Sequence, residues 1–130
     1  MPAQDDQYPV AAPAATVPTA PGVEVRLAGT ESAVCALSGD LDIDSLAPAE
    51  QALTELVAQR PRRMVVDLRE VGFCDSSGLN LLLRARLAAG NADVEFRLAA
   101  PSPQVARLLE ITGAEAVFSI HETVPAALAS

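Results

Sequence analysis

The chain has 130 residues, a formal net charge of −8 and 50% hydrophobic residues, which suits one compact domain and leaves no room for a second. All nine basic residues are arginines scattered along the sequence. Nucleic-acid binding needs clustered cations, so DNA and RNA are excluded as ligands. No apolar run approaches the ~20 residues of a membrane-spanning helix, and the acidic start lacks the features of a secretory signal. We therefore expect a soluble, cytoplasmic protein that contacts no membrane.

Residues 1–22 form a first segment that holds half of the prolines among alanine, threonine and valine. Proline at this spacing removes backbone donors and disfavours both a helix and a central strand. We expect a flexible arm with polyproline character that serves as a tail. The composition changes to periodic elements at Val23, so residues 23–130 are expected to form the folded domain.

The first periodic elements are predicted to be two strands and a helix. Apolar and charged residues alternate over 23–28, and 33–39 is a more buried apolar run, which together indicate a hairpin. A helix follows, with Ser45 as N-cap, Pro48 in its first turn and an end near residues 60–61. Its expected inward face consists of Leu46, Ala49, Leu53, Leu56 and Val57.

The middle of the chain continues with a strand and a second helix. Residues 64–68 (MVVDL) are an apolar run typical of a central strand. A helix begins after residues 75–76 and is expected to stop at Gly90. Its predicted inward face consists of Leu79, Leu82, Leu83 and Leu87, and its outward face of Asn80, Arg84 and Arg86.

The last third of the chain repeats the pattern of strand and helix. Residues 92–100 alternate as a strand, 101–113 form a capped helix that ends at Gly113, and 116–120 form a fifth strand before a short terminal helix. Strand-helix-strand units join parallel neighbours, while the opening hairpin adds an antiparallel strand. The order predicts an α/β fold with a mixed central β-sheet of about five strands covered by helices.

The most informative stretch is DSSG, residues 75–78, at the start of the second long helix. Its ordinary role would be structural, with Asp75 or Ser76 as N-cap and Gly78 allowing close packing. A cap explains one polar residue, but it explains four in a row between apolar segments less well. Loops at the ends of strands in α/β sheets also favour ligand or partner sites, so DSSG is a candidate site.

Catalytic roles lack the residues that they need. A nucleophilic serine requires a base, but the sole histidine, His121, lies near the C-terminus, and DSSG does not match G-x-S-x-G. The alternating aspartates of GDLDIDS (39–45) lack the glycine and distal glutamate of a calcium loop, and no phosphate-binding glycine motif occurs. Cys35 and Cys74 are interpreted as small buried thiols without a disulfide. We expect a protein that is not an enzyme, with no cofactor and no metal.

Modification of a serine is the remaining interpretation of DSSG. A phosphate on an exposed serine at a helix N-terminus would be tolerated by the helix dipole. On Ser76 it would add a charge of about −1.5 to −2 beside Asp75, and near Asp42 if the GDLD loop lies at the same edge. Such a charge weakens an interface strongly, so the residues favour a binding switch.

Three blocks of sequence, in this order, carry a family resemblance. LSGDLD (37–42) is similar to L-x-G-E-L-D, the segment 65–83 to an apolar strand followed by F-x-D-S-S-G-L-G-x-L-L, and 100–120 to S-P-x-V-x-R-L-hydrophobic-x-x-[ST]-G. In this combination they resemble the STAS domains of bacterial anti-sigma factor antagonists. Two positions depart from the family pattern: Asn80 stands where glycine is frequent, and Cys74 where methionine is frequent.

The resemblance implies a phosphorylation site at Ser76 and a partner surface around it. The partner-binding residues that it implies are Asp42, Asp75, Ser76, Ser77, Gly78 and Asn80. It implies further that the unphosphorylated protein binds an anti-sigma factor with a GHKL-type serine kinase site and thereby frees a sigma factor. Phosphorylation would end this binding, and a PP2C-type phosphatase would reset it. The free protein is expected to be a monomer.

An alternative stays open at this point. The protein could instead be a STAS-like scaffold or accessory module that phosphate does not control, with a transporter or lipid-trafficking complex as its partner. The scaffold and the phosphorylation switch differ in whether substitution of Ser76 changes partner binding. A third interpretation, an enzyme that acts through Ser76 or the acidic loop, predicts that the isolated protein turns over a substrate.

Overall fold

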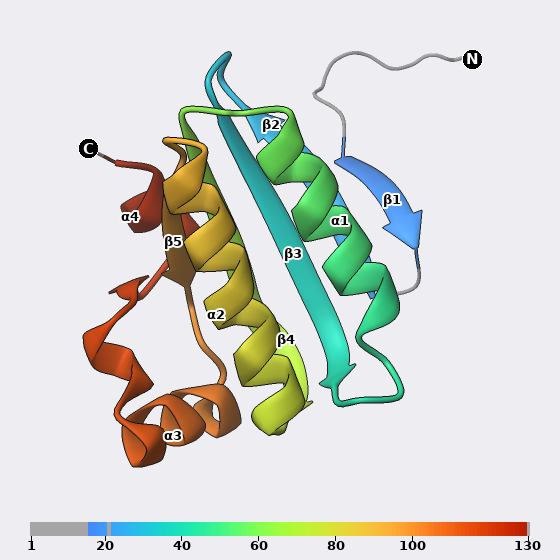
Figure 1. Cartoon of the computed structure of the whole chain (residues 1–130), viewed down its shortest axis with the longest axis vertical. Coiled ribbons are helices and arrows are strands. Elements are labelled where there is room, and N and C mark those ends of the chain that lie inside the picture. The colour runs from blue at the N-terminus through green and yellow to red at the C-terminus, as the bar shows by residue number, and fades with distance from the viewer. Residues whose placement is uncertain (1–15, 21, 130) are drawn as a thin grey trace.

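The protein folds around a six-stranded mixed sheet whose strands follow chain order (Figure 1). This computed structural model describes residues 16–20, by their backbone, and 22–129. The strands are β1 (Thr16–Ala20), β2 (Val23–Ala28), β3 (Ser32–Leu41), β4 (Arg63–Cys74), β5 (Glu95–Ala99) and β6 (Ser119–His121). The helices are α1 (Ala47–Ala58), α2 (Ser76–Asn91), α3 (Pro103–Thr112) and α4 (Val124–Leu128), with a 3-10 turn at Ala114–Ala116. The strands β1 to β3 pair antiparallel and β3 to β6 pair parallel, so the predicted mixed α/β sheet is confirmed.

The edge strand β1 lies in the segment that was predicted to be a flexible arm. Thr16–Ala20 pairs antiparallel with β2, with Pro18 opposite Glu24. The prediction for residues 1–22 is therefore wrong for this strand, and the sheet has six strands rather than about five. Proline is tolerated in an edge strand because one side of that strand has no partner. Residues 1–15 and 21 lie outside the described residues.

The helices cover the two faces of the sheet unequally. The helices α1 and α2 lie side by side over one face (Figure 1). Together with α3 they enclose the main core, in which Leu53 of α1, Leu82 of α2 and Leu109 of α3 are buried. The short helix α4 covers the opposite face through a small cluster of Val34, Val65, Ala99 and Ala127. The strand β4 lies between these layers, and each of its residues 63–68 is buried.

Two arginines hold α4 against the sheet. Arg63 donates a hydrogen bond from Nη1 to the carbonyl oxygen of Leu128 at 2.6 Å, and from Nε to Glu95 at 2.8 Å. Arg97 donates to two further carbonyl oxygens of the same segment, at 2.9 and 2.7 Å. The last carbonyls of a helix have no partner within the helix. The two guanidinium groups therefore cap the C-terminal end of α4.

The first helix begins later than its sequence predicted. Leu46, and not Ser45, occupies the N-cap position of α1, and no side chain accepts a capping hydrogen bond there. The backbone N–H of Ser45 instead donates to the carbonyl oxygen of Asp42 at 2.9 Å, which closes a turn before the helix. The predicted inward face is confirmed for Ala49, Leu53 and Leu56, which are buried, and partly for Leu46 and Val57.

The second helix confirms the predicted start but not the whole predicted face. Leu79 and Leu82 are buried, Leu83 is partly buried, and the outward residues Asn80, Arg84 and Arg86 are exposed. Leu87, which was predicted to point inward, is 63% exposed. At ~100° per residue it lies ~200° from the buried Ala85 and Ala89, on the far side of the helix. The helix continues one residue past Gly90, to Asn91.

The C-terminal elements follow the prediction in order and type, but two strands are shorter than predicted. The strand predicted over 92–100 is β5, which begins at Glu95 and ends at Ala99. The helix α3 has Ser102 as N-cap and ends at Gly113, whose φ of 76° is left-handed. The strand predicted over 116–120 is shorter and later, because the chain first makes the 3-10 turn and then pairs with β5 only from Ser119. Phe118 is buried before the strand begins, against Phe96 of β5.

Candidate functional site

The structure brings the GDLD and DSSG segments to the same edge of the sheet. The parallel strands β3 and β4 end together, with Leu41 opposite Cys74. The backbone N–H of Asp75 donates to the carbonyl oxygen of Leu41 at 3.3 Å. Asp42 and Asp75 each directly follow one of the two paired residues, so they leave the sheet side by side. Figure 1 shows the end of β3 and the start of α2 at this edge.

Asp75 is the N-cap of α2. Its backbone is extended, and its Oδ1 accepts hydrogen bonds from the N–H groups of Ser77 at 2.9 Å and Gly78 at 3.2 Å. Two of the first backbone donors of the helix are thereby satisfied. The structural role considered for Asp75 is confirmed, and Ser76 does not share it.

Gly78 is the point of closest packing in the site. A Cβ atom added to it would lie 2.5 Å from the carbonyl oxygen of Leu41, 2.7 Å from Cys74 Sγ and 2.8 Å from Leu41 Cβ. Side chains essentially never approach their neighbours so closely, so only glycine fits between α2 and β3 here. The expected close packing at Gly78 is confirmed.

Ser76 lies open to solvent at the first position of α2. Its side chain is exposed, whereas that of the neighbouring Ser77 is half-buried. Asn80 follows four residues later and is also exposed, so it lies on the same face of the helix as Ser76. The Ser76 hydroxyl is therefore accessible from solvent without unfolding of the helix.

Asp42 shapes the loop beside this serine. Its side chain is half-buried, and its Oδ1 accepts a hydrogen bond from the backbone N–H of Asp44 at 3.2 Å. Its carbonyl oxygen accepts from Ser45 at 2.9 Å. Asp42 therefore holds a tight turn, and its negative charge remains at the edge that carries Ser76.

The six residues of the predicted partner surface come from this one edge, but they are not equally accessible. Ser76 and Asn80 are exposed, Asp42, Asp75 and Ser77 are half-buried, and Gly78 is buried. A partner can therefore contact the first two directly, while Gly78 acts through the packing that it allows.

The catalytic alternatives gain no support from the geometry. His121 lies in β6, where its Nε2 is 3.0 Å from Ser119 Oγ. Within residues 22–129, no group of three potential metal ligands gathers. Both cysteines are free. Burial raises the pKa of the Cys35 thiol to about 12 and, helped by the charge of Asp75, that of Cys74 to about 11.

Two apolar residues at the same edge are exposed, and neither was predicted as a site residue. Ile43, at the tip of the turn held by Asp42, is 75% exposed, and Phe73, three residues before Ser76, is 48% exposed. Both apolar side chains lie close to acidic residues. In the sequence, the only feature that marks Ile43 is its position between two aspartates. Its exposure could not be predicted, because it depends on how the loop turns.

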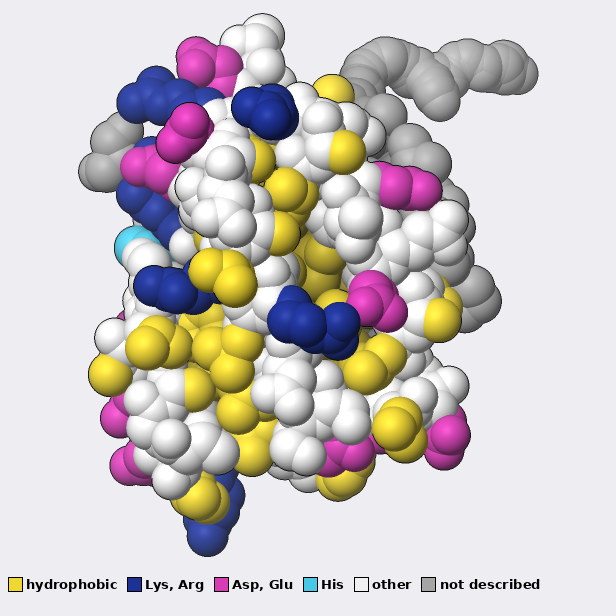
Figure 2. Space-filling model, viewed as in Figure 1, with side chains coloured by type: hydrophobic (Ala, Val, Ile, Leu, Met, Phe, Trp, Pro, Cys, Tyr) yellow, Lys and Arg dark blue, Asp and Glu magenta, His cyan; other side chains and the backbone are white. Residues whose placement is uncertain are grey.

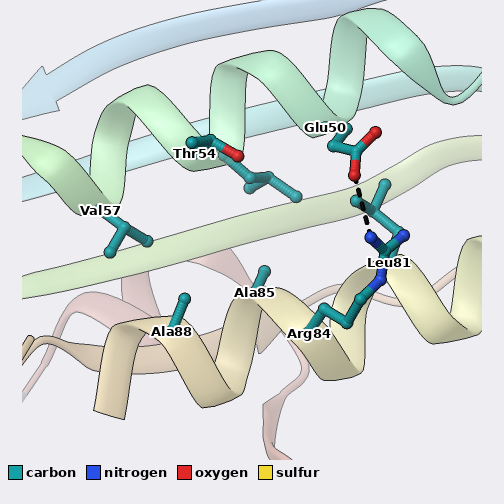
Figure 3. A pocket seen from close by; sticks show the side chains of 8 residues that line it. Glu50, Thr54, Val57, Leu81, Arg84, Ala85 and Ala88 are labelled. Atoms are coloured by element: carbon teal, nitrogen blue, oxygen red, sulfur yellow. Dashed lines mark hydrogen bonds and ion pairs between the residues drawn. The ribbon is translucent and has the colours of Figure 1, made fainter. Parts of the chain in front are cut away.

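A separate hollow of about 210 Å³ lies between α1 and α2 (Figure 3). Leu53, Val57 and Leu81 line it, and Arg84 Nη1 lies 2.9 Å from Glu50 Oε2 at one end. Figure 2 shows apolar side chains at the bottom of this hollow. Both charged side chains are about half exposed, so the pair contributes little to stability.

Comparison with known proteins identifies the family. Residues 25–121 match the family model described as "Mlab, STAS domain". A STAS-domain containing protein of Pseudomonas aeruginosa is 46% identical over 66 residues, which cover 51% of this chain and 65% of that protein. The anti-sigma-B factor antagonist of Staphylococcus aureus is 30% identical over 86 residues, which cover 66% of this chain and 80% of that protein. A solved structure of an anti-sigma factor antagonist from Mycobacterium paratuberculosis has a TM-score of 0.71 at 29% identity, with 88% of this chain and 96% of that chain covered.

The chain belongs to the STAS domain family, and its relatives include anti-sigma factor antagonists. The family resemblance and the predicted fold class are thereby confirmed. STAS anti-sigma factor antagonists are regulatory proteins and not enzymes, in agreement with the prediction. None of the helices in the described part of the chain has the length and apolar character needed to cross a membrane.

Proposed function

We propose that the protein is an anti-sigma factor antagonist that phosphorylation of Ser76 switches off. The unphosphorylated form binds an anti-sigma factor with a GHKL-type serine kinase site and so releases a sigma factor, and a PP2C-type phosphatase restores it. The observation that carries the proposal is the exposed Ser76 hydroxyl at the start of α2, beside Asp75 and the turn of Asp42.

The hydrogen bonds of the first helical turn support an electrostatic switch. The Asp75 side chain already accepts hydrogen bonds from the backbone N–H groups of Ser77 and Gly78. The Asp75 carbonyl oxygen accepts a further hydrogen bond from the backbone N–H of Leu79. A phosphate on Ser76 would find these donors occupied and a carboxylate beside it. Its charge would stay uncompensated within the chain and would face the partner.

The size of this effect is sufficient for a switch. An uncompensated pair of like charges about 5 Å apart, at an effective dielectric constant of about 20, costs about 3 kcal/mol. This energy corresponds to more than about a hundredfold in affinity. The fold itself should survive phosphorylation, because the charge is added outside the core at a helix N-terminus.

The test begins with Ser76→Ala protein as bait in native lysate, because this variant retains binding and cannot be phosphorylated. A captured kinase is identified by mass spectrometry, purified and incubated with ATP and the wild-type protein. We expect intact-mass measurement to show one added phosphoryl group, which phosphatase removes. Ser119→Ala, at an exposed serine of β6 outside the proposed partner surface, is the matched control and should be phosphorylated as the wild type is, while Ser76→Ala should not.

Binding of Ser76→Glu to the same kinase completes the test. We expect its Kd to be about a hundredfold or more above that of Ser76→Ala. Equal affinities, or no phosphate on the wild-type protein with active kinase and ATP, would count against the proposal.

A second candidate is an accessory module of another complex that phosphate does not control. It is favoured by the description of the matching family model, which names Mlab. In that case substitutions of Ser76 leave partner binding unchanged, and protein isolated from its native cell carries no phosphate under any growth condition.

A further inference from the structure

The edge that carries Ser76 combines exposed apolar groups with unpaired acids. Ile43 has the largest exposed fraction of the exposed large hydrophobic residues in the described part of the chain, and the aromatic ring of Phe73 is half-exposed. Figure 2 shows acidic and apolar side chains next to each other along the edge where β3 ends. Apolar side chains of this size are the groups that supply most of the binding energy when a partner buries them.

The turn beneath Ile43 is fixed before any partner arrives. Asp42 accepts hydrogen bonds from the backbone N–H groups of Asp44 and Ser45, at 3.2 and 2.9 Å. The turn is also joined to the first turn of α2, since Asp75 donates to Leu41. Binding therefore loses little conformational entropy in ordering this loop, which favours affinity.

The charges at this edge define the chemistry of the partner. Asp40 and Asp44 are exposed and Asp42 is half-buried. The ion pairs found within residues 22–129 involve none of these three carboxylates. A surface that buries Ile43 must also face these acids, so it requires arginine or lysine around an apolar pocket.

We propose that Ile43 is the apolar anchor of the partner interface, inserted into a pocket on the anti-sigma kinase that basic residues surround, with Phe73 as a second contact. This inference rests on the proposed function and goes beyond that function by naming the residue that supplies binding affinity. Ser76 then controls the charge of an interface whose apolar contact lies in the neighbouring loop.

The test measures affinity for the purified kinase captured by Ser76→Ala, by isothermal titration calorimetry without ATP. We expect Ile43→Ala to raise Kd about tenfold or more, and Phe73→Ala to raise it by a smaller factor. Leu27→Ala is the matched control, because Leu27 is 64% exposed but pairs with Ala33, near the opposite end of β3. It should leave Kd within about twofold. Circular dichroism checks that each variant is folded.

Salt dependence tests the basic surroundings of the pocket. Asp44→Asn should slow association and flatten the dependence of the association rate on ionic strength. Asp93→Asn is the matched control. It also removes one negative charge, but beyond the other end of α2 and at a left-handed backbone position that asparagine tolerates. It should change neither the association rate nor its dependence on ionic strength.

The outcomes separate the two proposals. If Ile43→Ala binds as tightly as the wild type while Ser76→Glu binds weakly, the proposed role of Ile43 is wrong and the proposed phosphorylation switch is supported. If Ile43→Ala binds weakly while Ser76→Glu binds as the wild type does, the proposed phosphorylation switch is wrong and the proposed role of Ile43 is supported. If Ser76→Ala captures no kinase, both are overturned.

Discussion

The first turn of α2 depends on the absence of a side chain at Gly78. We expect Gly78→Ala to lower the free energy of unfolding by roughly 1–3 kcal/mol, because its Cβ would overlap the backbone of Leu41. Gly90→Ala is the matched control on the same helix, where a Cβ meets nothing within 4 Å. It should raise stability by roughly 0.5–1 kcal/mol. Urea denaturation of both variants checks this, and equal midpoints would contradict it.

Glu95 makes part of the stability dependent on pH. The hydrogen bond and positive charge of Arg63 hold the pKa of this half-exposed carboxyl below its usual value. A lowered pKa in the folded state stabilises the protein above the usual Glu value of about 4.3, and the gain disappears as pH falls through the folded pKa. We expect Glu95→Gln to be less stable than the wild type at pH 7, and the difference to shrink towards pH ~3. Thermal unfolding at both pH values measures this, and a constant difference would be the contrary result.

The site residues that lie within a sequence motif could be predicted, and those outside a motif could not. DSSG drew attention through its composition, and the exposure of Ser76 agrees with that reading. Asp42 could be placed only conditionally, because its position depends on the pairing of β3 with β4. Ile43 was not predicted, since nothing in the sequence tells how far a loop residue projects.

At the scale of elements, α4 depends on the arginines beneath it more than on its own five residues. Arg63 is buried and bonds both Leu128 and Glu95. We expect Arg63→Ala to lower the free energy of unfolding by roughly 1–3 kcal/mol, because the carbonyl oxygen of Leu128 loses this hydrogen bond and Glu95 keeps only the longer ion pair with Arg97. Hydrogen exchange should also become faster at the amides of α4. The neighbouring Arg62 pairs with Glu31 at 3.7 Å on the surface, so Arg62→Ala should cost less than about 1 kcal/mol. Similar losses in both variants would refute this role.

Elements with strong periodicity were predicted well, and those fixed by tertiary contacts were not. The inward face of α1 follows from apolar spacing, and the hairpin of β2 and β3 follows from alternation. Leu87 was misplaced because five leucines in α2 allow more than one choice of inward face, and the buried Ala85 and Ala89 decide that choice by packing. The strand β1 was missed because prolines argue against a central strand, and only the pairing with β2 makes it an edge strand.

For the whole molecule, β1 protects the edge of the sheet. Deletion of residues 1–20 would leave β2 as the edge strand, with unpaired backbone groups beside the exposed Leu27. Such an edge is a template for pairing with a second copy. We expect this variant to self-associate in sedimentation velocity experiments, while deletion of residues 1–15, which keeps β1, should behave as the full chain does. Identical behaviour of the two deletions would be evidence against the protective role.

The strand order β1-β2-β3-β4-β5-β6 repeats the order of synthesis. Each strand that leaves the ribosome can join an edge that already exists, and no strand has to enter between two paired neighbours. Domains that emerge from the N-terminus first can begin to assemble before translation ends. In this sequence of events the edge that carries Asp42, Ser76 and Asn80 has been synthesised by residue 80, and residues 81–130 complete the sheet afterwards.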